Sequence, residues 1–234
     1  MPNALRDHAT GRFERVAHRG TPRELMENTL PGFLRALDRG ADAVELDAHV
    51  TKDGVVVVHH DAEAGTPARL IAGTQWNELA LIDLGGGARI PRLDDVLQVL
   101  GDRGTIYVEL KGRDIEDAVI PVCRHFGRRF ALHSFDLDAM TRVAQKAPDL
   151  PRGILLDQDI AHPAEALREA ANRIGPRDVW PHWSLVDEAF VRAAHDLGTR
   201  VVVWTVNSRS AAIALVALGV DAICSDDLRL LAKL

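Results

Sequence analysis

Cysteine is scarce in this sequence: its 234 residues contain only Cys123 and Cys224. The two are far apart and match neither a zinc nor a redox spacing, which argues against a disulfide framework and a cysteine metal site. We expect both to be buried, reduced thiols, as is usual in a cytosolic protein.

Long apolar runs are also missing. The first residues, MPNALRDHATGRFERV, lack the apolar segment of a signal peptide, and no run approaches the length of a membrane span. The sequence therefore predicts a cytoplasmic protein with no stable membrane insertion. Its formal net charge of -6 argues against nucleic acid as a partner, because such binding needs a basic face.

What the chain does have is a regular alternation of strand and helix patterns. Eight predicted strands are each followed by a predicted helix, and Val55 to His59 is set aside as a hairpin arm on the second strand. The expected strands are Arg15–Ala17, the acidic strand from Ala43, Thr105–Lys111, Phe130–Phe135, Arg152–Leu156, Val179–Trp183, Arg200–Val206 and Ala222–Ser225. The expected helices follow the N-cap Thr29 and span Leu93–Leu100, Ile115–Phe126, Leu137–Gln145, Pro163–Ile174, Val186–Leu197, Ser210–Leu218 and Leu228–Lys233.

Eight such units predict an α/β protein with a (β/α)8 TIM barrel, a β-hairpin extension after the second strand, and a single domain over residues 1–234. A doubly wound open sheet is the alternative. That fold would need a glycine-rich phosphate turn after the first strand, and the turn present, HRGTPRE, does not match G-x-G-x-x-G.

Carboxylates gather at the predicted mouth of this barrel. Glu45 and Asp47 are two residues apart on one strand and so project to the same side, and Glu109 ends the next strand of the barrel. Three such acids need compensating charge. A divalent cation is the simplest source, and all-oxygen ligation suits Mg²⁺, Ca²⁺ or Mn²⁺ rather than zinc. The alternative is a structural ion network with Arg19, Lys52 and Lys111.

Two of the ten histidines end predicted strands close to an acid. His18 and His60 could therefore serve as base and acid around a metal-bound anion. His59 points away from His60, and His49 is expected to lie beyond the mouth. The others are predicted to be ordinary surface or helix residues: His8, His125, His133, His162 and His195. At the remaining strand ends, Trp204 is expected in the wall of the site and Asp226 as a cap of the final helix.

In order along the chain, HRG-(x)6-ENT, ELD-x-x-x-TKDG-x-x-VV-x-HD, VELK, HSF, WTVN and GVDAICSD together resemble the glycerophosphodiester phosphodiesterases. This resemblance runs from Val16 to Asp226 and implies a divalent-metal hydrolase acting on small glycerophosphodiesters. It implies catalytic roles for His18 and His60, and metal ligation by Glu45, Asp47 and Glu109. It also implies substrate-binding roles for Arg19, Lys111 and Trp204, and a buttress formed by Glu27 and Asn28.

Some positions depart from the family pattern. Met26 and Ala62 replace prolines that are usual there, and the loop from Asp61 to Pro91, where the family has a capping insertion, looks short.

Two other functions stay open: a lysophospholipase D-type enzyme that acts on lysolipids, and a non-catalytic phosphate-binding barrel. The sequence also leaves open the head group, the physiological metal, the choice between a cyclic phosphate intermediate and direct water attack, and whether the chain forms a homo-oligomer.

Overall fold

A computed structural model describes residues 13–126, 129–232 and 234. Within these residues, eight parallel strands form one closed ring, because the first strand pairs both with the second and with the last. The ring strands are β1 (Glu14–His18), β2 (Ala43–Val50), β6 (Thr105–Leu110), β7 (Phe130–Ser134), β8 (Arg152–Leu156), β9 (Asp178–Pro181), β10 (Arg200–Val203) and β11 (Ala222–Ser225). The predicted TIM barrel is confirmed.

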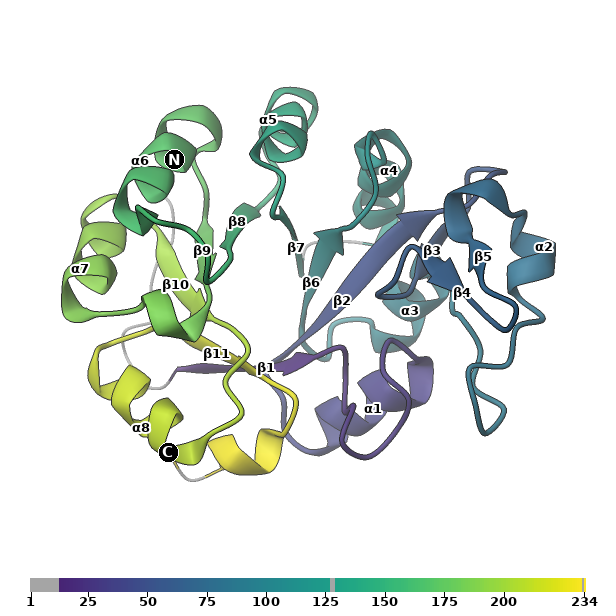
Figure 1. The fold of residues 1–234 in the computed structure, drawn as a ribbon, viewed down its shortest axis with the longest axis horizontal. Helices are drawn as coiled ribbons and strands as arrows, with labels where there is room; N and C mark the ends of the chain where they lie inside the picture. The colour runs from purple at the N-terminus through teal and green to yellow at the C-terminus, as the bar shows by residue number, and fades with distance from the viewer. Residues whose placement is uncertain (1–12, 127–128, 233) are drawn as a thin grey trace.

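Helices surround the ring, as Figure 1 shows. They are α1 (Leu30–Asp38), α3 (Leu93–Leu100), α4 (Glu116–Phe126), α5 (Leu137–Lys146), α6 (Pro163–Ile174), α7 (Glu188–Asp196) and α8 (Arg209–Ala217). The helix predicted at Leu228–Lys233 is wrong in type: Leu228–Leu231 forms a short 3₁₀ helix, η3, and Lys233 lies outside the described residues. No helix in the described part of the chain is both long and apolar enough to cross a bilayer.

The first helix shows how local sequence sets these boundaries. Thr29 caps α1 by accepting a hydrogen bond from the backbone N–H of Gly32, and Pro31 occupies the first turn, where its missing N–H costs nothing. Gly40 follows the end of the helix with a φ of +85°, a conformation that glycine adopts without steric cost. The chain can then turn back into β2.

The interior of the ring is filled by alternating small and large side chains. Ala43, Ala131 and Ala222 leave room for the fully buried rings of Tyr107 and Trp180, which meet edge to face. A second and larger apolar core lies between the strands and the helices. This packed interior forms a floor beneath the carboxyl ends of the strands.

The predicted hairpin extension is present. β3 (Val56–Val58) pairs antiparallel with the far end of β2, with Ala48 opposite Val58. The chain continues into a small unit beside β2 and α3, seen on the right of Figure 1. It comprises β4 (Glu63–Ala64), β5 (Arg69–Leu70), η1 (Ile71–Gly73) and α2 (Trp76–Leu79), and it has a small apolar core that includes Val57, Ile71 and Leu79.

Candidate active site

The neighbouring strands β2 and β6 bring the predicted acids together. Asp47 on β2 is the register partner of Glu109 on β6, and Glu109 is in turn the partner of His133 on β7. Register partners on neighbouring parallel strands project to the same face, which here is the barrel interior. Glu45 projects to that face two residues before Asp47. All four side chains are buried.

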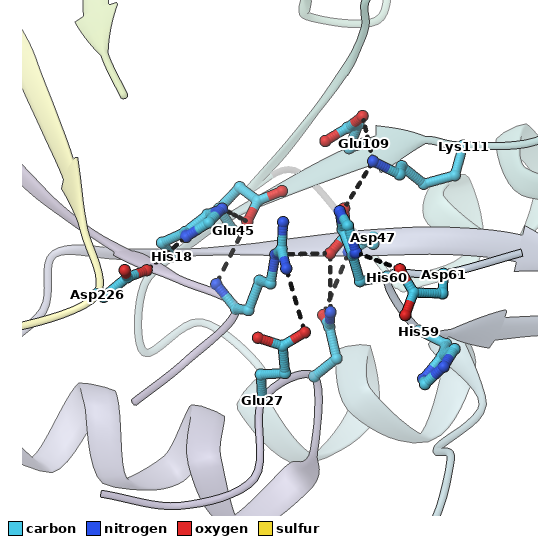
Figure 2. A network of polar contacts seen from close by, with 12 residues as sticks. His18, Glu27, Glu45, Asp47, His59, His60, Asp61, Glu109, Lys111 and Asp226 are labelled. Atoms are coloured by element: carbon cyan, nitrogen blue, oxygen red, sulfur yellow. Dashed lines mark hydrogen bonds and ion pairs between the residues drawn. The ribbon is translucent and has the colours of Figure 1, made fainter. Parts of the chain in front are cut away.

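One cavity of about 200 Å³ opens at this end of the barrel. The predicted residues His18, Arg19, Glu45, His60, Glu109, Lys111 and Trp204 all line it, together with Phe135, Leu155, Trp180, Cys224 and His133. Both predicted catalytic histidines therefore face the same space. Of the residues predicted to be catalytic, metal-binding or substrate-binding, Asp47 alone is outside this lining; it lies against Arg19 and Lys111. Figure 2 shows its contact with Lys111.

His18 is held from behind by the last strand of the barrel. Its Nδ1 lies 2.6 Å from Oδ1 of Asp226, and its Nε2 lies 3.9 Å from Glu45. Burial alone would lower the pKa of His18, but the hydrogen bond to Asp226 and the charge of Glu45 outweigh burial and raise it. Asn207 fixes Asp226 in turn by donating to its second oxygen.

The prediction that Asp226 caps the final helix is wrong, because that cap is the next residue. The Asp227 side chain accepts a hydrogen bond from the backbone N–H of Arg229 at the start of η3. Asp226 instead points to His18, and Figure 2 shows the two side by side.

His60 follows β3 and reaches the cavity from the hairpin. Its Nδ1 lies 2.8 Å from Oδ1 of Asp61, and its carbonyl oxygen lies 3.2 Å from Nε2 of His49. His49 is buried on β2 and so contacts the backbone of the His60 segment. The ring of His59 turns to the carbonyl of Glu63 instead, as the sequence predicted for a residue on the opposite side.

Two cationic side chains, Arg19 and Lys111, lie among the acids. Arg19 Nε is 3.2 Å from Asp47, while its Nη1 donates to Glu27. Lys111 Nζ lies 3.1 Å from Glu109 and 3.7 Å from Asp47. Burial alone would raise the pKa of Asp47, but the charges of Arg19 and Lys111 outweigh it and lower the pKa. Asp47 is thus ionised at neutral pH.

Asn28 fixes the orientation of Asp47. Its Nδ2 donates to Asp47 Oδ2 over 2.8 Å, and its Oδ1 accepts from the backbone N–H of Asp47. Asn28 and Arg19 both have positive φ angles, 54° and 53°. Such backbone strain in residues other than glycine is concentrated at functional sites, and here it falls on two residues that contact one carboxylate.

Glu109 behaves differently from Asp47. Burial, reinforced by the charge of Asp47, raises the pKa of Glu109 to about 8, even though Lys111 lies beside it. This carboxyl would ionise at neutral pH only with more positive charge nearby. Asp47 Oδ1 is also buried without a hydrogen-bond partner in the described structure. Both observations fit a site that takes up a cation.

The prediction that His133 is an ordinary surface or helix residue is wrong. It lies on β7, is only 1% exposed, and lines the cavity. Among the described residues, Glu45, Glu109 and His133 each offer one ligand atom within 4.8 Å of the others. Ligand atoms on opposite sides of a small divalent ion are roughly 4.2 Å apart, twice a bond of about 2.1 Å, so this group can hold an ion after small side-chain movements.

Trp204 forms part of the cavity wall, as predicted. Its Nε1 donates to the carbonyl of Trp180, and its ring meets Phe135 edge to face with centroids 5.4 Å apart. Phe135 is 42% exposed. Trp204 and Phe135 therefore form an apolar rim beside the charged side chains of the cavity. A molecule with a phosphate and a less polar group could contact both.

Comparisons with known proteins match nearly the whole chain. The profile of the glycerophosphoryl diester phosphodiesterase family matches residues 18–230. A glycerophosphodiester phosphodiesterase from Caldanaerobacter subterraneus subsp. tengcongensis is 29% identical over 91% of this chain and 93% of its own length.

Solved structures agree with this match. The glycerophosphodiester phosphodiesterase of Thermotoga maritima has a TM-score of 0.83 at 27% identity, covering 95% of this chain and 98% of that one. An Oleispira antarctica phosphodiesterase in complex with the product sn-glycerol-3-phosphate has a TM-score of 0.83 at 25% identity, covering 91% and 92%.

Proposed function

The chain belongs to the glycerophosphoryl diester phosphodiesterase family and is a phosphodiesterase, and we propose that it hydrolyses glycerophosphodiesters to glycerol 3-phosphate and an alcohol. One observation carries the proposal. A single cavity is lined by both predicted catalytic histidines, His18 and His60, by two cationic side chains and by two of the three predicted acidic ligands. Such a cavity offers a base, an acid and positive charge to one phosphate ester.

The proposed catalyst includes one divalent cation held by Glu45, Asp47 and Glu109. Mg²⁺ and Ca²⁺ are the first candidates and Mn²⁺ the third, because these ions prefer oxygen ligands. The raised pKa of Glu109 supports the assignment, and so does the buried Oδ1 of Asp47, which accepts no hydrogen bond from the described residues. When bound, the ion would supply Lewis-acid stabilisation of the phosphate and a template for the ester.

His18 is the proposed base. With the Nδ1 proton donated to Asp226, Nε2 is the nitrogen left to accept a proton from the attacking hydroxyl. The raised pKa of His18 makes Nε2 a stronger base than an unperturbed imidazole. The nucleophile is either the glycerol 2-hydroxyl, which would give a cyclic phosphate before hydrolysis, or a water molecule. A substrate lacking the 2-hydroxyl separates these routes, since only water attack would still turn it over.

His60 is the proposed acid, which protonates the departing alkoxide. Asp61 holds its Nδ1, so Nε2 is the nitrogen available to the leaving group. Arg19 and Lys111 would offset the negative charge that builds on the phosphate in the transition state. Trp204 would contact the part of the substrate that lies at the apolar rim.

A small molecule is the substrate that suits this cavity. A cavity of about 200 Å³ favours a short head group such as choline or ethanolamine over a lipid chain. Both cysteines are buried and unpaired, which suits a reducing compartment and supports a cytoplasmic location.

The test is hydrolysis of glycerophosphocholine, with release of glycerol 3-phosphate measured before and after removal of divalent cations by chelation. We expect turnover to stop with the chelator and to return when Mg²⁺, Ca²⁺ or Mn²⁺ is restored. Turnover of lysophosphatidylcholine alone would assign the enzyme to lysolipids instead. No turnover of either substrate with any of these ions would overturn catalysis at this site.

Variants test the two histidines separately. His18→Ala and His60→Ala should each lose roughly 10²–10⁴-fold in kcat, the usual contribution of a general acid or base. His162→Ala is the matched control, because that exposed histidine lies at the start of α6 and its ring makes no capping hydrogen bond. Full activity in either cavity variant would remove the proposed acid–base pair.

A further inference from the structure

His133 is a buried imidazole whose two ring nitrogens make no hydrogen bond to the described residues. The residue is only 1% exposed. A buried polar group in a native structure is nearly always satisfied, so the nitrogens of His133 indicate a ligand or water at this position.

The His133 ring lies beside two of the acids of the site. His133 is the register partner of Glu109, and its Nε2 lies 3.7 Å from Oε1 of Glu45. That distance is too long for a hydrogen bond but suits two ligands of one ion. On its other side the ring packs against Trp180, with centroids 4.5 Å apart, so the indole limits how far His133 can turn.

The packing around Trp180 keeps this arrangement in place. Gly153 on β8 is the register partner of His133, and a Cβ atom there would lie 2.7 Å from the carbonyl oxygen of Asp178 and 3.3 Å from Trp180. Glycine therefore lets β8 and β9 approach closely enough to bring the indole under the imidazole. A ring supported in this way is pre-organised to bind through nitrogen.

We propose that His133 is a nitrogen ligand of the cation in this site, and that the site therefore holds first-row transition ions more tightly than Ca²⁺ or Mg²⁺. The inference rests on the cation site proposed above and changes its chemistry. Ligation by oxygen alone suits Mg²⁺ and Ca²⁺, whereas an imidazole among the ligands favours ions such as Fe²⁺, Ni²⁺ and Zn²⁺. Each of these ions can accept the nitrogen lone pair that no protein donor occupies.

The direct test is pulsed EPR of the metal-free protein loaded with Mn²⁺ alone. We expect the wild-type spectrum to show strong coupling to a directly bound imidazole nitrogen. His133→Phe should lose this coupling, while the control His18→Asn should retain it. A wild-type spectrum without nitrogen coupling, or coupling that persists in His133→Phe, overturns the proposal. The wild-type spectrum decides the question even if His133→Phe fails to fold.

Calorimetric titration with Zn²⁺ and Ca²⁺ provides a second measurement. In wild type we expect Zn²⁺ to bind more tightly, and His133→Phe should weaken Zn²⁺ by roughly tenfold or more while changing Ca²⁺ little. Equal losses for both ions would point to general disruption and overturn the selectivity. Hydrolysis that depends on a cation, in a protein without nitrogen coupling, would overturn only this inference. Hydrolysis that survives chelation would instead overturn the proposed cation.

Discussion

Asp226 Oδ1 lies 2.6 Å from Nδ1 of His18, and this contact joins the segment after the last barrel strand to the end of the first. The Asp226 carboxylate contacts one side of the His18 ring, and His18 lines the cavity. Asp226 remains ionised because, although burial would raise its pKa, the hydrogen bond to His18 outweighs burial and lowers it. The contact thus orients the ring and makes it more basic.

Asp226→Asn should therefore slow the reaction and shift its pH dependence. The variant lacks the charge that raises the pKa of His18, so the acidic limb of kcat/KM should move to lower pH. We expect kcat to fall by roughly 10–10²-fold, less than for loss of the imidazole itself. The measurement is the pH profile of kcat/KM. Asp227→Asn is the control, since Asp227 pairs with Arg229 instead; a profile that moves equally in both variants would contradict the assignment.

Cation binding should release protons near neutral pH. The pKa of Glu109 is raised to about 8, so below that pH the metal-free carboxyl keeps a proton that a cation must displace. Affinity should therefore rise with pH up to about 8. Titration calorimetry in two buffers of different ionisation heat counts the protons. Glu109→Gln should bind more weakly and release fewer, and equal release by the two proteins would count against the raised pKa.

The same carboxyl should make metal-free stability depend on pH. In the unfolded chain Glu109 ionises near its ordinary pKa of 4.5, while in the folded chain it keeps its proton to about pH 8. The metal-free protein should therefore lose stability as pH rises from about 4.5 to about 8. Urea unfolding of wild type and Glu109→Gln across this range measures the effect. The loss should be smaller in Glu109→Gln, and identical pH dependence would show that Glu109 does not cause it.

Lys111→Met should lower kcat/KM with little effect on folding. The substitution keeps the apolar stem but removes the charge 3.1 Å from Glu109, which would assist the phosphate in the transition state. We expect a loss of about 10²-fold. Lys52→Met, in the exposed turn before β3, is the matched control and should keep wild-type activity. Steady-state kinetics with glycerophosphocholine decides, and near-normal kcat/KM in Lys111→Met would assign that charge a structural role only.

Gly20→Ala should destabilise the protein more than Gly54→Ala. Both glycines have positive φ, +89° and +82°, where alanine costs roughly 1–2 kcal/mol. At Gly20 a Cβ atom would also lie 2.8 Å from the backbone carbon of Gly32, whereas at Gly54 nothing lies within 4 Å. The clash should add roughly 1–3 kcal/mol. Free energies of unfolding from urea titration test the difference, and equal losses would mean that the α1 backbone moves aside at no cost.

Much of the fold could be predicted because apolar residues recur with a different period in strands and in helices. Arg152–Leu156 and Pro163–Ile174 have the predicted boundaries. The predicted strand Val179–Trp183 is too long, because β9 ends at Pro181 and Trp183 begins the short helix η2 (Trp183–Leu185). The strand ends where His182 caps η2: its Nδ1 accepts a hydrogen bond from the backbone N–H of Ser184, and this local contact outweighs the apolar pattern at that point.

The acids of the site could be predicted because residues two apart on a strand share a face. The sequence alone did not find His133, since Ser134 also ends β7 and a shift of one residue reverses the face. The register with Glu109 decides: His133 faces the acids, while Ser134 donates to the carbonyl of Leu110. Asp226 was assigned wrongly because its contact with His18 spans 208 positions along the chain and requires a closed ring.

Because the last strand closes the ring, the residues of the site are completed in a fixed order while the chain is synthesised. The acids on β2 and β6 and the imidazole of His60 all belong to the first half of the sequence, but Asp226 follows β11 near its end. While β11 is still inside the ribosome, the nascent chain would already contain the acids of the site. The imidazole of His18 would not yet have the Asp226 carboxylate behind it. Full esterase activity would thus arise only once β11 and Asp226 have joined the ring.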